Sequence, residues 1–165
     1  MKADWHVRWE CALHDQAQLD AWLACYDVIQ GSVTIQGGNI TDLTPLSNIV
    51  EITGNLMILM NTVLTSLDGL ENLADVSGAF YLYYNFQLSD CCAIDDLLTA
   101  GGVSGPVLIF FNAASSHCNS AAAIMAACPA APLVGSGGSN GFDQACSDCI
   151  PQGLMTVFPN PLLLL

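Results

Sequence analysis

Ile29-Gln-Gly-Ser-Val-Thr-Ile35 is the first copy of the sequence pattern that decides the fold. Three more copies follow it: Ile52-Thr-Gly-Asn-Leu-Met-Ile58, Val76-Ser-Gly-Ala-Phe-Tyr-Leu82 and Val103-Ser-Gly-Pro-Val-Leu-Ile109. Their glycines are 23, 24 and 27 residues apart. A period in this range is typical of solenoids, in which each turn of the chain stacks on the previous one.

Two more features repeat within the turns. In three of the four turns an asparagine follows the glycine by seven residues, at Asn61, Asn85 and Asn112, and Gly37-Gly38 replaces it in the first turn. Apolar residues then recur at matched offsets, as Leu43/Leu46/Ile49, Leu67/Leu70/Leu73, Cys91/Ile94/Leu97 and Cys118/Ala121/Ile124. A single turn cannot bury this second apolar edge, whereas stacked turns can, so we predict a mainly β fold of stacked turns.

The composition limits the partners of the chain. Hydrophobic residues make up 53% and charged residues 10% of its 165 residues. The chain has two basic and fifteen acidic residues, which gives a net charge of -13. Binding to nucleic acid requires basic patches, and attraction to anionic membranes requires basic residues, so we expect neither. No apolar run reaches the roughly 20 residues of a membrane-spanning helix.

The cysteine content indicates the compartment. Eight cysteines, an even number, are typical of an oxidising compartment, so we expect an extracellular or cell-surface protein. Residues 1–6 lack the apolar core of a signal peptide, which favours a mature or trimmed form. Cys11 and Cys25 enclose a segment of helical spacing, and a bridge between them would fix that helix as a cap on the first turn.

Four further cysteines lie near the last turns. Cys91 and Cys118 occupy the repeat position of Leu43 and Leu67, on neighbouring turns close enough for a disulfide, and Cys92 and Cys128 lie nearby in the sequence. Two bridges are therefore expected, and four cysteines leave three connectivities open. The alanine-rich segment 120–127 before Cys128 is predicted to be a closing helix.

The first ten residues form an extended arm by their pattern. Trp5, Val7 and Trp9 alternate with polar residues, as in a half-buried strand. Two interpretations are open: a strand folded back onto its own domain, or an arm that adds a strand to a neighbouring molecule.

The outer side of the predicted sheet is unusually apolar. Alternation turns Phe80 and Leu82 inward. It turns a set of apolar side chains outward, namely Met57, Leu59, Tyr81, Tyr83, Leu108 and Phe110. A large apolar patch usually marks an interface, so we expect coverage either by the chain's own tail or by another subunit.

Beyond residue 128 the sequence changes character. Residues 129–145 form a Pro/Gly/Ser linker, and residues 146–165 form an apolar tail that contains Val157 and Phe158. Cys146 and Cys149 open this tail in a Cys-x-x-Cys spacing, without the second ligand pair of a zinc site. Within the repeats, Asn39-Ile-Thr41 is a glycosylation sequon.

The repeats resemble a known family. The [Ile/Val]-x-Gly pattern, the asparagine corner, the apolar edge and the flanking cysteines resemble the receptor L domain, a leucine-rich-repeat-like β-helix. Ile40-Thr-Asp-Leu-Thr-Pro-Leu46 and Leu64-Thr-Ser-Leu-Asp-Gly-Leu70 are similar to repeats of secreted microbial proteins. The resemblance covers residues 11–128 and implies a short right-handed β-solenoid with helical N- and C-terminal caps.

A second resemblance concerns the tail. Val157-Phe-Pro-Asn-Pro161 is similar to the opening of the C-terminal sorting domain of a Bacteroidetes-type secretion system. It implies a bacterial extracellular protein.

The sequence contains no recognisable catalytic constellation. A nucleophile needs a base and an orienting group, and His6, His14 and His117 fall in the arm, the cap helix and the fourth turn. Cys118 has a structural role at its repeat position, so a Cys–His pair is not favoured. Acidic residues near one corner suggest a solvated edge rather than a calcium site. We expect no catalytic residues, no cofactor and no metal.

Two functional hypotheses follow. The first is a non-enzymatic extracellular structural protein that forms a homo-oligomer or filament, head to tail, by exchanging its apolar N- or C-terminal segment. The second, implied by the resemblance, is a secreted ligand- or carbohydrate-binding or adhesion module that uses the aromatic face. In both hypotheses the apolar outer residues form the contact surface. In the first hypothesis the arm and the tail are also contact segments.

Overall fold

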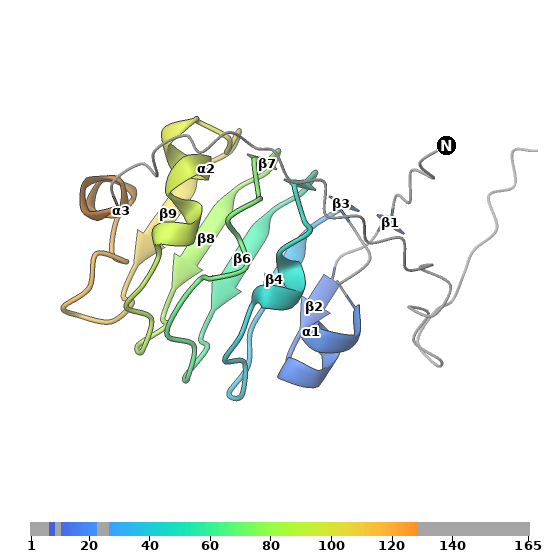
Figure 1. Cartoon of the computed structure of the whole chain (residues 1–165), viewed down its shortest axis with the longest axis horizontal. Coiled ribbons are helices and arrows are strands. Elements are labelled where there is room, and N and C mark those ends of the chain that lie inside the picture. Colours follow the sequence, from blue (N-terminus) through green and yellow to red (C-terminus); the bar gives the residue numbers. More distant parts are fainter. Residues whose placement is uncertain (1–6, 9–10, 23–26, 129–165) are drawn as a thin grey trace, which may run out of the picture.

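The computed structural model describes residues 7–8, 11–22 and 27–128, which form two parallel β-sheets (Figure 1). The first sheet contains, in order, β1 (Val7–Arg8), β3 (Val28–Gln30), β5 (Glu51–Ile52) and β7 (Asp75–Val76). The second contains β2 (Cys11–Leu13), β4 (Val33–Ile35), β6 (Leu56–Leu59), β8 (Phe80–Tyr83) and β9 (Val107–Phe110). Each turn adds a strand to these sheets in sequence order, which confirms the mainly β prediction.

Short helices complete the turns. They are α1 (Gln16–Trp22), η1 (Thr44–Leu46), η2 (Cys92–Ile94), α2 (Asp95–Thr99) and α3 (Ala121–Ala127). Helix α1 contacts β2 and η1, whereas α3 contacts η2 and α2. Figure 1 shows α1 and α3 toward opposite ends of the row of strands. Ser120 begins α3, because its side chain accepts a hydrogen bond from the N–H of Ala123.

The repeated glycine forms one corner of every turn. The N–H groups of Gly54, Gly78 and Gly105 each donate to the carbonyl of the preceding corner glycine, at 2.9 Å. A Cβ added at these three positions would lie 2.5 to 2.6 Å from the backbone of that preceding glycine. No larger residue fits at this separation, and the close stacking of backbones therefore explains the periodic glycine.

Apolar side chains fill the space inside the turns. Phe80 and Leu82 point inward from β8 and are fully buried, as alternation predicts. The second apolar edge supplies the remaining wall, and its columns are buried at Leu43/Leu67/Cys91/Cys118, Leu46/Leu70/Ile94 and Ile49/Leu73/Leu97/Ile124. Stacked turns bury the edge that a single turn leaves exposed, as the repeat predicts.

Asparagine side chains form the opposite corner. The Asn85 Oδ1 accepts hydrogen bonds from the backbone N–H and the Nδ2 of Asn61, both at 3.0 Å. The Asn85 Nδ2 donates to the carbonyl of Ile58, one turn back, at 2.9 Å. One buried side chain thus satisfies polar groups of the neighbouring turn on both its donor and its acceptor side.

The same arrangement repeats and produces a continuous ladder. The Asn112 Oδ1 accepts from the N–H of Asn85 at 3.2 Å and from its Nδ2 at 3.1 Å. The ladder begins at the N–H of Gly37, which donates to the Asn61 Oδ1 at 2.9 Å. It ends at Asn119, whose Oδ1 accepts from the N–H of Asn112 at 2.9 Å. We call Asn61, Asn85, Asn112 and Asn119 the asparagine ladder.

Part of the N-terminal segment belongs to the first sheet. Val7 and Arg8 pair in parallel with Ile29 and Gln30 of the same chain. For these two residues the pairing matches the interpretation of a strand folded back onto its own domain. The remaining predicted positions on the arm and the tail lie outside the described residues: Trp5, Trp9, Cys146, Cys149, Val157 and Phe158. Cys25, the predicted partner of Cys11 after the cap helix, lies outside them as well.

Replacing Asn85 with alanine should lower the free energy of unfolding by about 2–4 kcal/mol, because it leaves the buried N–H of Asn61 without its acceptor and removes the hydrogen bond to the carbonyl of Ile58. Urea denaturation measures the loss. Asn72→Ala is the matched control, since Asn72 is exposed and its one described hydrogen bond goes to the Ser47 carbonyl. A similar loss in both variants would contradict a special role for the ladder.

Candidate functional site

The residue before each of the first three ladder asparagines has an unusual backbone conformation. Met60, Tyr84 and Phe111 have φ angles of 52°, 59° and 54°. Large side chains rarely adopt this left-handed region, which costs on the order of 1 kcal/mol per residue. Their side chains are 45%, 39% and 61% exposed. The turn that presents the asparagine inward therefore presents its neighbour to solvent.

In the last two strands this geometry gathers aromatic rings. Tyr83 stacks on Phe110 with ring centroids 5.0 Å apart, and Tyr84 stacks on Phe111 at 5.5 Å. The two stacks are almost perpendicular, since Phe110 and Phe111 meet at 89°. Phe86 adds a fifth ring, with its centroid 6.2 Å from that of Tyr84. We call Tyr83, Tyr84, Phe86, Phe110 and Phe111 the aromatic corner.

The aromatic corner extends the outer face predicted from alternation. Met57, Tyr81, Tyr83 and Phe110 are half-buried on that face, and Leu108 is exposed. Leu59, also predicted to point outward, is 9% exposed and lies in register with Tyr83. Leu59 is not part of the core cluster inside the turns. Its burial is therefore compatible with a side chain that points outward, as predicted.

Sequence reasoning did not single out Met60, Tyr84, Phe86 and Phe111 as site residues. The signal for three of them is their position directly before the ladder asparagine. Alternation along a strand says nothing about this position, because a left-handed residue leaves the strand pattern.

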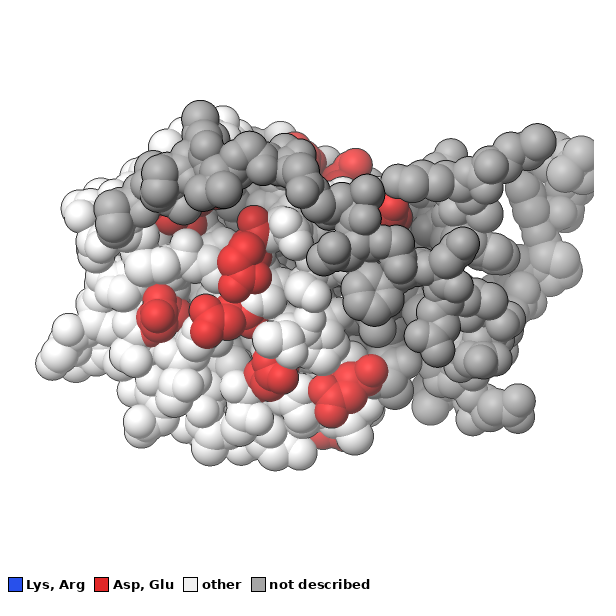
Figure 2. All heavy atoms as spheres, in the orientation of Figure 1, with Lys and Arg blue, Asp and Glu red and all other residues white. Residues whose placement is uncertain are grey.

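The described part of the chain is acidic. Figure 2 shows acidic side chains spread over the displayed face of the described residues and no lysine or arginine among them. Arg8 is the only basic residue in the described part of the chain. This charge disfavours an anionic ligand and is compatible with a neutral or cationic one.

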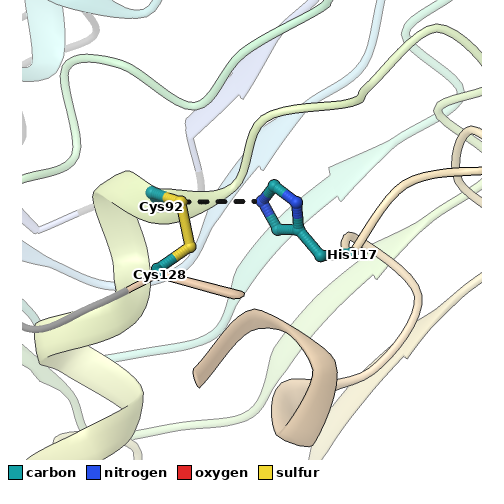
Figure 3. Close-up of side chains that lie close together, drawn as sticks. All are labelled: Cys92, His117 and Cys128. Atoms are coloured by element: carbon teal, nitrogen blue, oxygen red, sulfur yellow. Dashed lines mark hydrogen bonds between the residues drawn. A yellow bond between two sulfur atoms is a disulfide. The ribbon is translucent and has the colours of Figure 1, made fainter. Parts of the chain in front are cut away.

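Four cysteines and a histidine lie close together in the last turns. Disulfides join Cys91 to Cys118 and Cys92 to Cys128, which settles the connectivity that the sequence left open. Figure 3 shows His117 directed at the Cys92–Cys128 bridge, with its Nε2 3.7 Å from the Cys92 Sγ. The His117 Nε2 also accepts a hydrogen bond from the N–H of Cys91 at 3.2 Å.

One cluster of candidate metal ligands occurs among the described residues. There, only Cys92, His117 and Cys128 form a group of three or more ligand side chains whose ligand atoms lie within 4.8 Å of one another. Asp42 and Asp90 instead accept local backbone N–H groups, from Thr44 at 2.9 Å and from Cys92 at 3.1 Å. The acidic residues predicted to lie near one corner of the repeats do not form such a group. They are Asp42, Asp68, Asp90, Asp95 and Asp96.

The predicted glycosylation site is accessible in this arrangement. Asn39 lies in a bend between β4 and η1 and is exposed. Glycosylation at Asn39 remains a prediction.

Stacked parallel strands, an asparagine ladder and an apolar inner edge rich in leucine are the repeated features of this domain. The family model of the receptor L domain matches residues 25–120, and the chain belongs to this family. No curated protein and no solved structure gave a significant match. None of the helices among the described residues has the length and hydropathy to cross a membrane.

The left-handed corner generates a stability prediction. Met60→Gly should be more stable than Met60→Ala by about 1 kcal/mol, because alanine keeps the Cβ that opposes a φ of 52° and glycine removes it. Met125 in α3 is the matched control, since it is equally exposed within a helix. There the order should reverse, with glycine less stable than alanine by about 1 kcal/mol. Denaturant unfolding of the four variants measures both differences, and the same order at both positions would contradict the corner's strain.

Proposed function

We propose that the chain is a non-enzymatic extracellular binding module and that the aromatic corner is its contact surface. Receptor L domains form a family of binding domains rather than enzymes. The two disulfides are typical of proteins from oxidising compartments. The observation that carries the proposal is the aromatic corner itself, in which Phe86 and Phe111 are each more than half exposed.

The physical basis is the large apolar area that these rings offer at low entropic cost. Ring stacking already limits the movement of Tyr83, Tyr84, Phe110 and Phe111, so a ligand has little side-chain freedom to remove. Strained backbone that displays functional groups is a recurrent property of binding sites. The ligand class that fits is a neutral saccharide, whose C–H faces lie on aromatic rings, with the exposed Gln87 nearby in the chain.

We further infer that the stacked turns form a short right-handed β-solenoid over residues 11–128, with α1 and α3 as its end caps. The ordered parallel pairing and the contacts of the two helices support this inference. An extracellular or cell-surface location follows from the same proposal.

The saccharide proposal is tested on the full-length chain. Phe86→Ser with Phe111→Asn should weaken binding to immobilised neutral glycans at least about tenfold, because both side chains are removed and asparagine accepts the left-handed backbone. Glycan arrays followed by calorimetry measure this. Val63→Ser with Met125→Ser is the control, as both residues are exposed and apolar and lie outside the corner. Failure of the wild-type chain to bind any neutral glycan would refute the saccharide class.

Self-assembly is the second candidate function, favoured by the last strand. β9 is the outermost strand of the second sheet, and its Val107 and Leu108 are exposed. An apolar edge strand accepts a strand from another chain, and a head-to-tail contact of this kind propagates into a filament. The donated segment would be the N-terminal arm or the apolar tail of a second copy.

The assembly proposal makes a separate prediction. Leu108→Lys should lower the sedimentation coefficient of the wild-type assembly to that of a monomer, since a charge on an edge strand opposes strand addition. Sedimentation velocity on the full-length chain measures the change, and Val63→Lys controls for added charge. A wild-type chain that stays monomeric at high concentration would refute self-assembly.

A further inference from the structure

The two disulfides differ in their access to solvent. Cys91 and Cys118 are fully buried in the column that leucines occupy in earlier turns. Cys92 is exposed, while its partner Cys128 is buried. Thiol–disulfide exchange requires access of the attacking thiolate to a sulfur atom. A reductant should therefore open the Cys92–Cys128 bridge before the inner one.

The position of His117 gives this outer bridge a second property. In a tetrahedral zinc site, Zn–S bonds of about 2.3 Å and Zn–N bonds of about 2.0 Å hold a sulfur and a nitrogen roughly 3.5 Å apart. The His117 Nε2 lies 3.7 Å from the Cys92 Sγ, close to that separation. After reduction, the two sulfurs need to separate to about 3.8 Å by side-chain rotation. The Cys128 Sγ, which lies within 4.8 Å of the His117 Nε2, needs to reach about 3.5 Å from it in the same movement.

The hydrogen bond of the imidazole is also compatible with metal binding. The N–H of Cys91 can only donate, so the His117 Nε2 that it contacts at 3.2 Å carries a lone pair. A metal would take the place of this amide as the partner of the lone pair. The Asp90 Oδ1, 4.0 Å from the same nitrogen, is close enough to supply a fourth ligand after a small side-chain movement.

We propose that reduction of the Cys92–Cys128 disulfide creates a binding site for Zn²⁺ or a similar divalent metal. The ligands are the two thiolates and the His117 Nε2, with Asp90 or water completing a tetrahedron. A dithiol supplies two electrons and two protons to the bridge and is itself oxidised to a disulfide. Metal binding then releases both thiol protons, because the sulfurs bind as thiolates. A disulfide oxidant that takes two electrons from the two thiolates re-forms the bridge, is itself reduced to a dithiol with two protons from water, and releases the metal, so the site depends on redox state.

The proposal is independent of the aromatic corner and has its own test. The full-length chain carries Cys146→Ser and Cys149→Ser, because that Cys-x-x-Cys pair would bind metal itself once reduced. A phosphine reductant opens the outer bridge and is then removed without oxygen. Alkylation and mass spectrometry should find Cys92 and Cys128 free and the inner pair still bonded. Co²⁺, added as the probe, should then bind with the absorption of tetrahedral cobalt thiolate.

His117→Ala should weaken cobalt binding by more than the roughly 10- to 100-fold that loss of an outer-shell partner costs. His14→Ala is the matched control, because His14 is exposed and contacts the Gln36 carbonyl. It should bind cobalt as the parent chain does, and the unreduced chain should not bind cobalt.

Several outcomes would overturn the proposal. One is a reduced, folded chain without the cobalt–thiolate absorption, and another is equal cobalt affinity in the His117→Ala and His14→Ala variants. Loss of the native circular dichroism after reduction in the presence of Co²⁺ would mean that no folded site forms. Equal reduction of the inner and outer bridges would refute the difference in access on which the proposal rests.

Discussion

The hydrogen bonds of buried asparagine side chains are the constraint on which the structure depends. At this corner the chain turns away from the second sheet, and the backbone N–H groups of Asn61, Asn85 and Asn112 do not pair with a neighbouring strand. The side chains of Asn61, Asn85 and Asn112 supply the missing donors and acceptors from one turn to the next. Among the described residues, no buried side-chain nitrogen or oxygen lacks a partner. Each turn therefore completes the hydrogen bonding of the turn before it.

The ladder links the interior of the domain to its surface. Turning an asparagine inward requires the preceding residue to turn outward in a left-handed conformation, at Met60, Tyr84 and Phe111. Glycine stacking at the other corner fixes the separation of the turns, since Gly54 and Gly78 contact the glycine before them directly. With both corners fixed, the rings of neighbouring turns meet at stacking distance. The aromatic corner is thus a consequence of the repeat as much as of its own side chains.

Much of the fold could be predicted from the sequence, because its causes are periodic. The spacing of the glycines, the asparagines and the inner apolar residues follows directly from stacking, and the buried direction of Phe80 follows from alternation. The remaining features break the period. Asn119 ends the ladder only seven residues after Asn112. The choice of disulfide partners depends on where α3 returns the chain to Cys92. The approach of His117 to Cys92 depends on the irregular segment between β9 and α3.

Native-state hydrogen exchange of the full-length chain tests the central role of the ladder most directly. The backbone N–H groups of Asn61, Asn85 and Asn112 donate to side chains in the interior rather than to a neighbouring strand. If the ladder holds the turns together, these amides exchange as slowly as those in the middle of the second sheet, at the rate of global unfolding. Exchange at the rate of exposed loop amides would contradict the account.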